Sequence, residues 1–87
     1  MKIYNYMEDI VKDILDDIIV QKQDICKCAK CKLDTIAWSL NRLPSKYIVS
    51  DKGRVYAKLK QQEMQFRADV VRELAKAIAL IKRHPRH

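Results

Sequence analysis

The 87-residue sequence has little glycine, little proline and an odd number of cysteines. One Gly and two Pro exclude a loop-rich chain and favour long regular elements. Three cysteines confined to positions 26–31 argue against a disulfide framework. No apolar run approaches the roughly 20 residues that cross a bilayer, and the first ten residues lack the apolar run of an export signal. We therefore expect one cytosolic domain over residues 1–87, with its thiols kept reduced.

The charge of the chain is distributed unevenly around a net value of +7. Residues 1–26 carry a net charge of −3, residues 27–60 carry +7 and residues 61–87 carry +3. A basic middle segment attracts anions such as phosphates, nucleic acid or an acidic protein surface. The alternative is an ordinary lysine-rich surface in contact with solvent.

Three segments have apolar residues at the spacing of an amphipathic helix. The first helix is predicted from Ile3 to about Gln21 and the second from about Cys31 to Asn41, where Leu43-Pro44 ends it. The third is predicted from about Arg54 to Lys82. In the second helix the predicted buried stripe consists of Leu33, Ile36, Ala37 and Leu40.

The segment 45–50, between the second and third helices, contains Tyr47, Ile48 and Val49, which favour extended backbone. A single short strand cannot form a sheet, so we expect either an irregular connector or pairing with the same segment of a second copy. The third helix would span about 40 Å at 1.5 Å per residue, longer than the other two helices. Part of it must pack on something else, and we predict a homodimer.

The cysteines form the pattern Cys-x-Cys-x-x-Cys through Cys26, Cys28 and Cys31. Zinc prefers four ligands in a tetrahedron, and a two-residue gap lets a turn bring two thiolates onto one ion. The start of a helix and neighbouring lysines favour the thiolate form. The pattern therefore predicts a zinc site. The alternatives are three idle reduced thiols, a thiol redox site, or an iron–sulfur cluster that would lack its fourth cysteine.

A fourth zinc ligand must come from elsewhere in the chain. The histidines of the sequence, His84 and His87, lie at its C-terminal end and could reach the cysteines if the third helix folds back. Asp24 is nearer in sequence but is a less typical zinc ligand. A site with an open position would suit catalysis, yet no residue is placed to act as its base. We therefore predict a structural zinc ion and no enzymatic activity.

Together these observations predict an all-α fold, a small bundle of about three helices with a short extended connector, stapled by zinc and forming a dimer. Several local motifs also occur in a characteristic order. They are Tyr6-Met7-Glu8, the cluster from Cys26 to Cys31 with Leu33-Asp34, and Leu40-Asn41-Arg42-Leu43-Pro44 followed by Lys46-Tyr47-Ile48-Val49. With these motifs, the sequence resembles the late competence development protein ComFB family of bacteria from about Tyr4 to its end.

The resemblance implies a small helical homodimer with a cysteine-bound zinc ion and no catalytic activity. Some members of the family have a fourth cysteine near the C-terminus, and His87 stands closest to that place here, with His84 next. Members have also been described as receptors for cyclic dinucleotides, with roles in natural competence and type IV pilus function. The resemblance thus implies a regulatory or binding protein, with a competence or pilus protein as a further partner.

A cyclic dinucleotide carries two phosphates and two bases that can stack, which suits a two-fold cleft lined by Arg and an aromatic ring. Arg42, Lys46, Tyr47 and Arg54 flank the extended connector and are the candidate ligand contacts. Alternatively, Arg42 caps the end of the second helix and Tyr47 packs in the core. The second candidate function is a small basic nucleic-acid-binding protein, although the chain lacks the alternating basic and aromatic residues typical of single-strand binders.

Overall fold

The computed structural model describes residues 2–22, 25–50 and 56–83. The three predicted helices are confirmed, and they are accompanied by two short strands. The described elements in chain order are β1 (Lys2–Asn5), α1 (Met7–Gln21), α2 (Ala29–Leu40), β2 (Tyr47–Ser50) and α3 (Tyr56–Arg83).

The two strands form an antiparallel ribbon in which Lys2 lies opposite Ser50 and Asn5 lies opposite Tyr47. The prediction of an all-α fold is therefore wrong in this part, because the extended segment pairs with the N-terminus of its own chain. The first helix begins at Met7 and not at Ile3. Ile3 fits a helical period, but β-branched and aromatic residues also favour a strand, and pairing with a distant partner decides between the two.

The faces of the ribbon alternate between core and solvent, as expected for strands. Tyr4 and Ile48 lie opposite each other and pack against the hydrophobic core. Ile3 and Val49, the next pair, are 72% and 52% exposed. The ribbon therefore closes one end of the core with one face and presents apolar side chains on the other.

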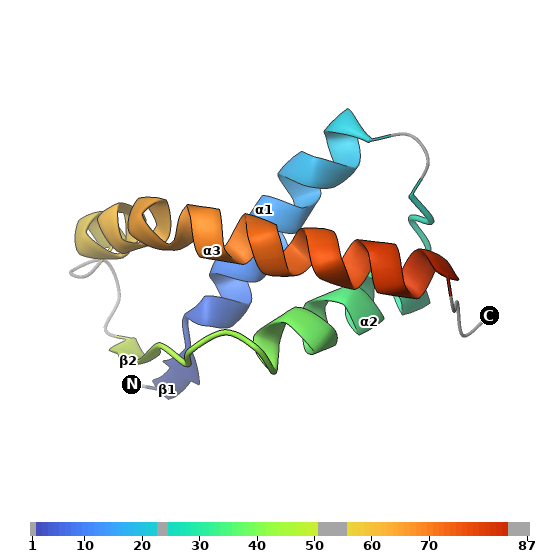
Figure 1. Ribbon diagram of the computed structural model, residues 1–87. Helices are drawn as coiled ribbons and strands as arrows, with labels where there is room; N and C mark the ends of the chain where they lie inside the picture. The colour runs from blue at the N-terminus through green and yellow to red at the C-terminus, as the bar shows by residue number, and fades with distance from the viewer. Residues whose placement is uncertain (1, 23–24, 51–55, 84–87) are drawn as a thin grey trace.

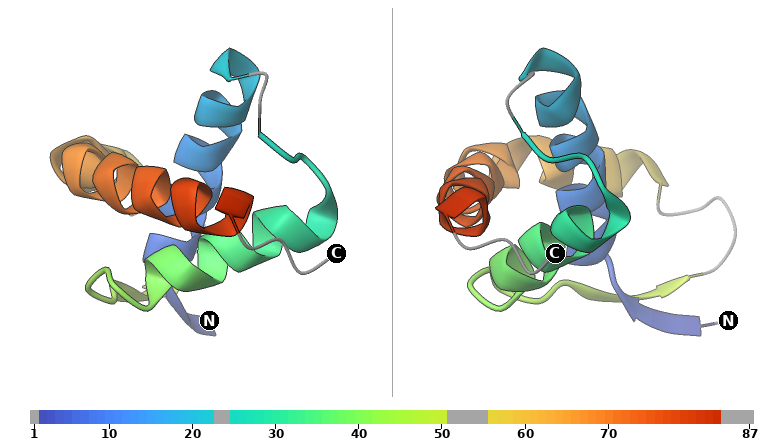
Figure 2. Two further views of the ribbon diagram at one scale, coloured as in Figure 1. Left: turned by 45° about the vertical axis from the view of Figure 1, so that its right-hand side comes forward. Right: turned by 90° about the vertical axis from the view of Figure 1, so that its right-hand side faces the viewer.

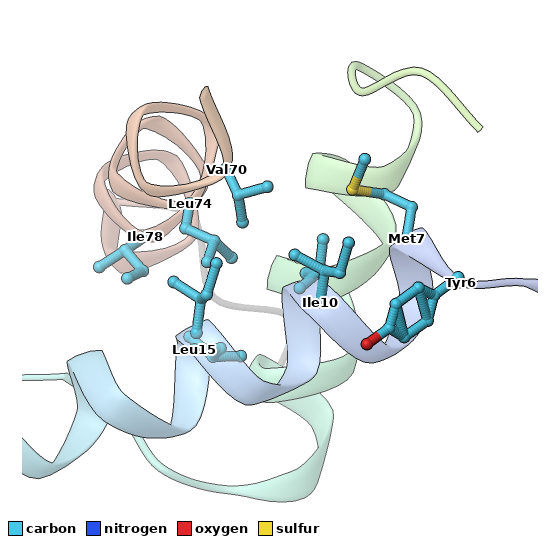
Figure 3. Packing of buried hydrophobic residues seen from close by; sticks show 9 residues of the cluster. Tyr6, Met7, Ile10, Leu15, Val70, Leu74 and Ile78 are labelled. Carbon is cyan, nitrogen blue, oxygen red and sulfur yellow. The ribbon is translucent and has the colours of Figure 1, made fainter. Parts of the chain in front are cut away.

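The core is formed mainly by α1 and α3, whose predicted apolar faces meet (Figure 3). Fully burying a Leu or Ile side chain contributes about 1.5–3 kcal/mol, so this contact dominates the stability of the domain. The side chains that are almost fully buried at this contact are Met7, Ile10, Val11, Ile14 and Leu15 from α1 and Val70 and Leu74 from α3.

The buried face of α2 differs from the predicted one. Its buried residues are Cys31, Thr35 and Ser39, whereas Leu33 is 63% exposed. Ile36 and Leu40 are half-buried and do pack against the core. The buried Thr35 hydroxyl donates a hydrogen bond to the Cys31 carbonyl oxygen at 2.8 Å, which lowers the cost of burying it. The spacing of the largest apolar residues predicted the wrong buried face for α2, because the side chains that face inward are small.

The helices α2 and α3 run in opposite directions beside each other, and α1 crosses them (Figures 1 and 2). As a result, α3 ends at the end of the molecule where α2 begins, and the ribbon lies at the other end of α2 (Figure 1). The molecule measures 41 × 22 × 19 Å, and α3, with 28 residues, extends along its long axis. Among the described residues, no helix combines the length and apolar character needed to cross a membrane.

Candidate metal centre

The cysteine segment joins α1 to α2 and is fixed at both sides. Ile25, just before the first cysteine, packs against the hydrophobic core. Cys28 has extended backbone dihedrals and is the N-cap of α2, and its sulfur accepts a hydrogen bond from the Cys31 backbone N–H at 3.4 Å. The helix therefore begins at Ala29, earlier than predicted. The cap uses a sulfur atom where Ser or Asp is more usual.

The three sulfur atoms converge on one point. The Sγ atoms of Cys26 and Cys28 are 3.5 Å apart, and the Sγ atoms of all three cysteines lie within 4.8 Å of one another. Tetrahedral zinc with bonds of about 2.3 Å places its sulfur ligands about 3.8 Å apart. Small side-chain rotations therefore suffice to bring all three sulfur atoms onto one ion. The donor set fits zinc, which prefers thiolates.

The electrostatics of the cluster also favour a cation. The pKa of Cys28 is lowered, first by the hydrogen bond from the Cys31 backbone N–H and then by contact with Cys26. Burial raises the pKa of Cys31 to about 12, and interactions with Cys26 and Cys28 add to this rise. Three neighbouring sulfur atoms cannot all become thiolates unless a positive charge compensates them. A divalent metal ion supplies that charge and replaces their protons.

The family model described as "Late competence development protein ComFB" matches residues 4–85. The chain belongs to the ComFB family. The resemblance found in the sequence is thereby confirmed, and it covers nearly the whole chain.

A solved structure of a ComFB family member, the late competence protein ComFB from Bacillus subtilis, has a similar fold. Its TM-score is 0.78 at 27% sequence identity, and the match covers 97% of this chain and 92% of that chain. The chain has no significant match among curated protein sequences. The two chains thus share one fold over most of their lengths.

Several residues predicted for the ComFB site lie outside the described part of the chain. These are the candidate zinc ligands His87, His84 and Asp24, and the candidate ligand contact Arg54. The structure does place the last described turn of α3, ending at Arg83, at the end of the molecule where the cysteine segment enters α2 (Figure 1). The last described residue, Arg83, thus lies at the same end of the molecule as the start of α2 (Figure 1).

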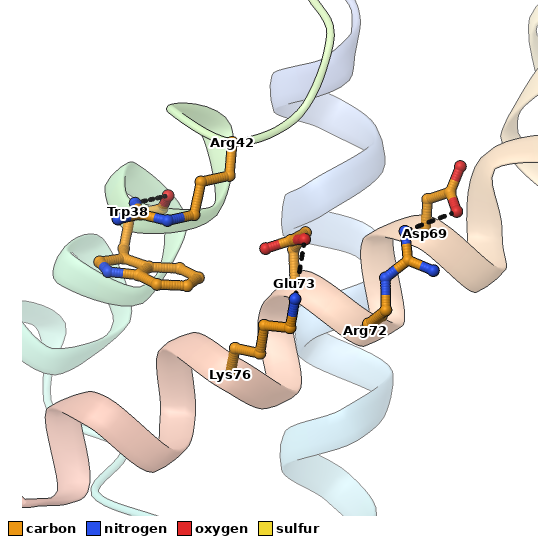
Figure 4. Close-up of polar contacts among 6 residues, drawn as sticks. All are labelled: Trp38, Arg42, Asp69, Arg72, Glu73 and Lys76. Carbon is orange, nitrogen blue, oxygen red and sulfur yellow. Dashed lines mark hydrogen bonds and ion pairs between the residues drawn. The ribbon is translucent and has the colours of Figure 1, made fainter.

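The candidate ligand contact Arg42 lies just after the end of α2. Its guanidinium lies 3.6 Å from the centre of the Trp38 ring, and its Nη1 donates a hydrogen bond to the Trp38 carbonyl oxygen at 3.2 Å (Figure 4). Cation–π contacts at exposed sites contribute about 0.5–1 kcal/mol. Arg42 thus donates a hydrogen bond to a carbonyl group in the last turn of α2. This agrees with the alternative prediction that Arg42 caps the end of the second helix.

The other two described candidates lie at the entry to β2. The Lys46 ammonium lies 4.7 Å from the centre of the Phe66 ring, so this side chain lies over α3. Tyr47 is 66% exposed, and the alternative prediction that it packs in the core is wrong. Tyr47 therefore offers an aromatic ring to solvent close in sequence to two cationic side chains.

Asn5 is a structural residue that the sequence analysis missed. Its Oδ1 accepts hydrogen bonds from the backbone N–H of Met7 at 3.1 Å and from that of Lys46 at 2.7 Å. One side chain thereby joins the start of α1 to the segment before β2. A signal was present, because Asn5 stands three residues before Glu8 at the start of an apolar repeat, which is typical of a helix N-terminus.

An apolar groove of about 360 Å³ lies between α1 and α2, beside the cysteine segment. The exposed Leu33 is part of this groove, and two lysines flank it. The side chain of Lys32 lies 3.8 Å from Asp16 across the groove. The groove is lined by Lys12, Leu15, Asp16, Ala29, Lys32, Leu33 and Ile36.

Proposed function

We propose that this ComFB family member is a non-enzymatic regulatory protein of competence, stabilised by one structural zinc ion. The observation that carries this proposal is the convergence of the sulfur atoms of Cys26, Cys28 and Cys31 within 4.8 Å. A structural role is supported because Cys31 is buried and Cys28 caps α2, so a bound ion would join the connecting segment to a helix start. We propose His87 as the fourth ligand, with His84 as the alternative.

Elemental analysis of the purified protein together with its native mass tests this proposal. We expect one zinc ion per chain, and a clear loss of zinc in His87→Ala or in His84→Ala, whichever removes the fourth ligand. Arg86→Ala, in the same tail, is the matched control and should keep its zinc. Freshly purified protein without metal would refute the structural zinc ion.

We further propose that the protein acts as a homodimer. Apolar side chains gathered on one exposed surface commonly mark contact with a partner. The exposed face of the ribbon offers such a surface through Ile3, Tyr47 and Val49. Val49→Asp places a charge on this face and should shift the native mass from two chains to one if the ribbon contributes to the dimer contact. A native mass of one chain for the unmodified protein would contradict the dimer itself.

We propose a cyclic dinucleotide as the ligand of the dimer, with Arg42, Lys46, Tyr47 and Arg54 as its contacts. An exposed tyrosine next to cationic side chains suits a molecule that combines phosphates with stackable bases. Calorimetry with cyclic di-AMP and with cyclic di-GMP tests this directly. Arg42→Ala should weaken binding more than Arg72→Ala, an exposed arginine on α3 that pairs with Asp69 (Figure 4). Absence of heat with either nucleotide would leave a protein-docking role within competence or pilus function.

A further inference from the structure

The three cysteines of the cluster are not equivalent in their access to solvent. Cys26 and Cys28 are exposed, whereas Cys31 is 4% exposed. The two exposed residues stand two positions apart, and Cys28 enters α2 with extended backbone dihedrals. Their Sγ atoms are 3.5 Å apart. The cluster therefore contains an accessible sulfur pair beside a protected third sulfur.

We propose that Cys26 and Cys28 form an oxidisable pair that hydrogen peroxide converts into a disulfide, and that this oxidation expels the zinc ion. The inference rests on the proposed zinc site and adds a way to regulate it. An S–S bond is about 2.05 Å long, so the two sulfur atoms must approach by roughly 1.5 Å, which side-chain rotation in an exposed segment can supply. Cys31 stays reduced because its side chain is buried and protected from the oxidant.

The chemistry balances with peroxide as the named oxidant. One sulfur of the pair attacks a peroxide oxygen, the O–O bond breaks, and a sulfenic acid and one water form. The second sulfur then attacks the sulfenic sulfur, the S–S bond forms, and the hydroxyl group leaves as a second water. Two thiols are oxidised by two electrons and one peroxide is reduced. If the two sulfur atoms start as zinc-bound thiolates, the same two electrons pass to peroxide. The two protons needed to form two waters then come from solvent, and the ion is released.

Release of the ion follows from the ligand count. Of the three described sulfur donors, two are consumed by the disulfide, and a disulfide sulfur is a poor ligand for zinc because the thiolate is the ligand form. Cys31 remains as the single described reduced sulfur donor, in the first turn of α2. Oxidation therefore separates the connecting segment from the metal while leaving the apolar core of α1 and α3 in place.

The experiment follows zinc release and disulfide formation together during titration of the purified, reduced protein with hydrogen peroxide. A chromophoric chelator reports the released zinc, and peptide mapping by mass spectrometry locates the disulfide. We expect zinc release to track a Cys26–Cys28 disulfide, with a loss of about 2 Da per chain. A thiol reductant with added zinc should reverse both changes.

Two variants keep the test decisive. Cys31→Ser retains the exposed pair and should still form the disulfide, whereas Cys26→Ser should not, and circular dichroism confirms that each is folded. A disulfide that involves Cys31, or zinc release with no Cys26–Cys28 bond, would overturn the inference. Zinc content measured before oxidation distinguishes failure of this inference from failure of the proposed zinc site. Reduced protein without zinc refutes the zinc site and its expulsion, while the disulfide map still decides whether the pair exists.

Discussion

The helices α1 and α2 are held in the same small domain by different kinds of contact. The residues that α1 buries against α3 are large and apolar, among them Ile10, Ile14 and Leu15. The buried residues of α2 are Cys31 and the small polar Thr35 and Ser39. Because the stabilisation from burial scales with apolar area, α1 gains far more than α2 from its buried face. A helix with such a face depends more on how its ends are anchored.

The cysteine cluster lies at the N-terminal end of the helix that needs such an anchor. Half-buried Ile36 and Leu40 hold the remainder of α2 on the core. We therefore expect the contact between α1 and α3 to be independent of metal and the start of α2 to depend on it.

The largest effect is expected from Leu74→Ala in the contact between α1 and α3. Leu74 is fully buried, so the substitution leaves a cavity and should lower the free energy of unfolding by about 2–5 kcal/mol. Urea denaturation with and without a chelator measures this loss, which should be the same in both conditions. Leu80→Ala, at an exposed position of the same helix, should change stability by less than about 0.5 kcal/mol. A loss that requires bound metal would contradict the proposed independence.

The second effect concerns the metal and α2. At free zinc about 100-fold above its dissociation constant, bound zinc adds about 3 kcal/mol to the free energy of unfolding, and a chelator should remove this gain. Hydrogen exchange should then show lost protection in the first turns of α2 and little change in the middle of α1. In Cys31→Ser the chelator should have no further effect. Equal loss of protection in α1 and α2 would show that the two helices do not differ in this way.

The smallest effect is expected at the other end of α2, where no metal is involved. Asn5→Ala removes the acceptor for the backbone N–H groups of Met7 and Lys46 and should cost about 1–2 kcal/mol, with or without zinc. Thermal unfolding of this variant can be compared with Asn41→Ala. Asn41 donates its side-chain hydrogen bond to the Ala37 carbonyl oxygen at an exposed site, so water can replace it. Similar losses of stability in both variants would show that the hydrogen bonds of Asn5 contribute no more than an exposed one.

The sequence predicts those parts of the molecule that depend on local pattern. The apolar repeats of α1 and α3 are strong because large side chains recur at helical spacing, and their middle turns are buried as expected. The grouping of the three cysteines follows from the spacing of Cys26, Cys28 and Cys31, since residues so close in sequence must also be close in space. The proposed fourth ligand of a zinc ion could not be derived in this way, because it would come from a part of the chain distant in sequence.

Features that depend on distant partners or on small side chains were not predictable in the same way. Pairing of β1 with β2 depends on tertiary contacts, and Ile3 fits a strand as well as a helix. The buried face of α2 is marked by Thr35 and Ser39, which hydropathy assigns to the surface. The charge of Arg42 suggests a ligand contact, but its guanidinium lies against Trp38, a neighbour one helical turn away.

The ribbon has a consequence for the order in which the chain folds. Asn5 must meet Lys46, a residue 41 positions later, so neither the pairing of β1 nor the hydrogen bond from Lys46 to Asn5 can form until all of α1 and α2 have been made. Closing so long a loop costs chain entropy before its contacts repay that cost. During synthesis, the N-terminal residues therefore stay unpaired while the helices that follow them in the sequence form. We expect the strand pair to be a late event in folding that fixes an arrangement the helices have already reached.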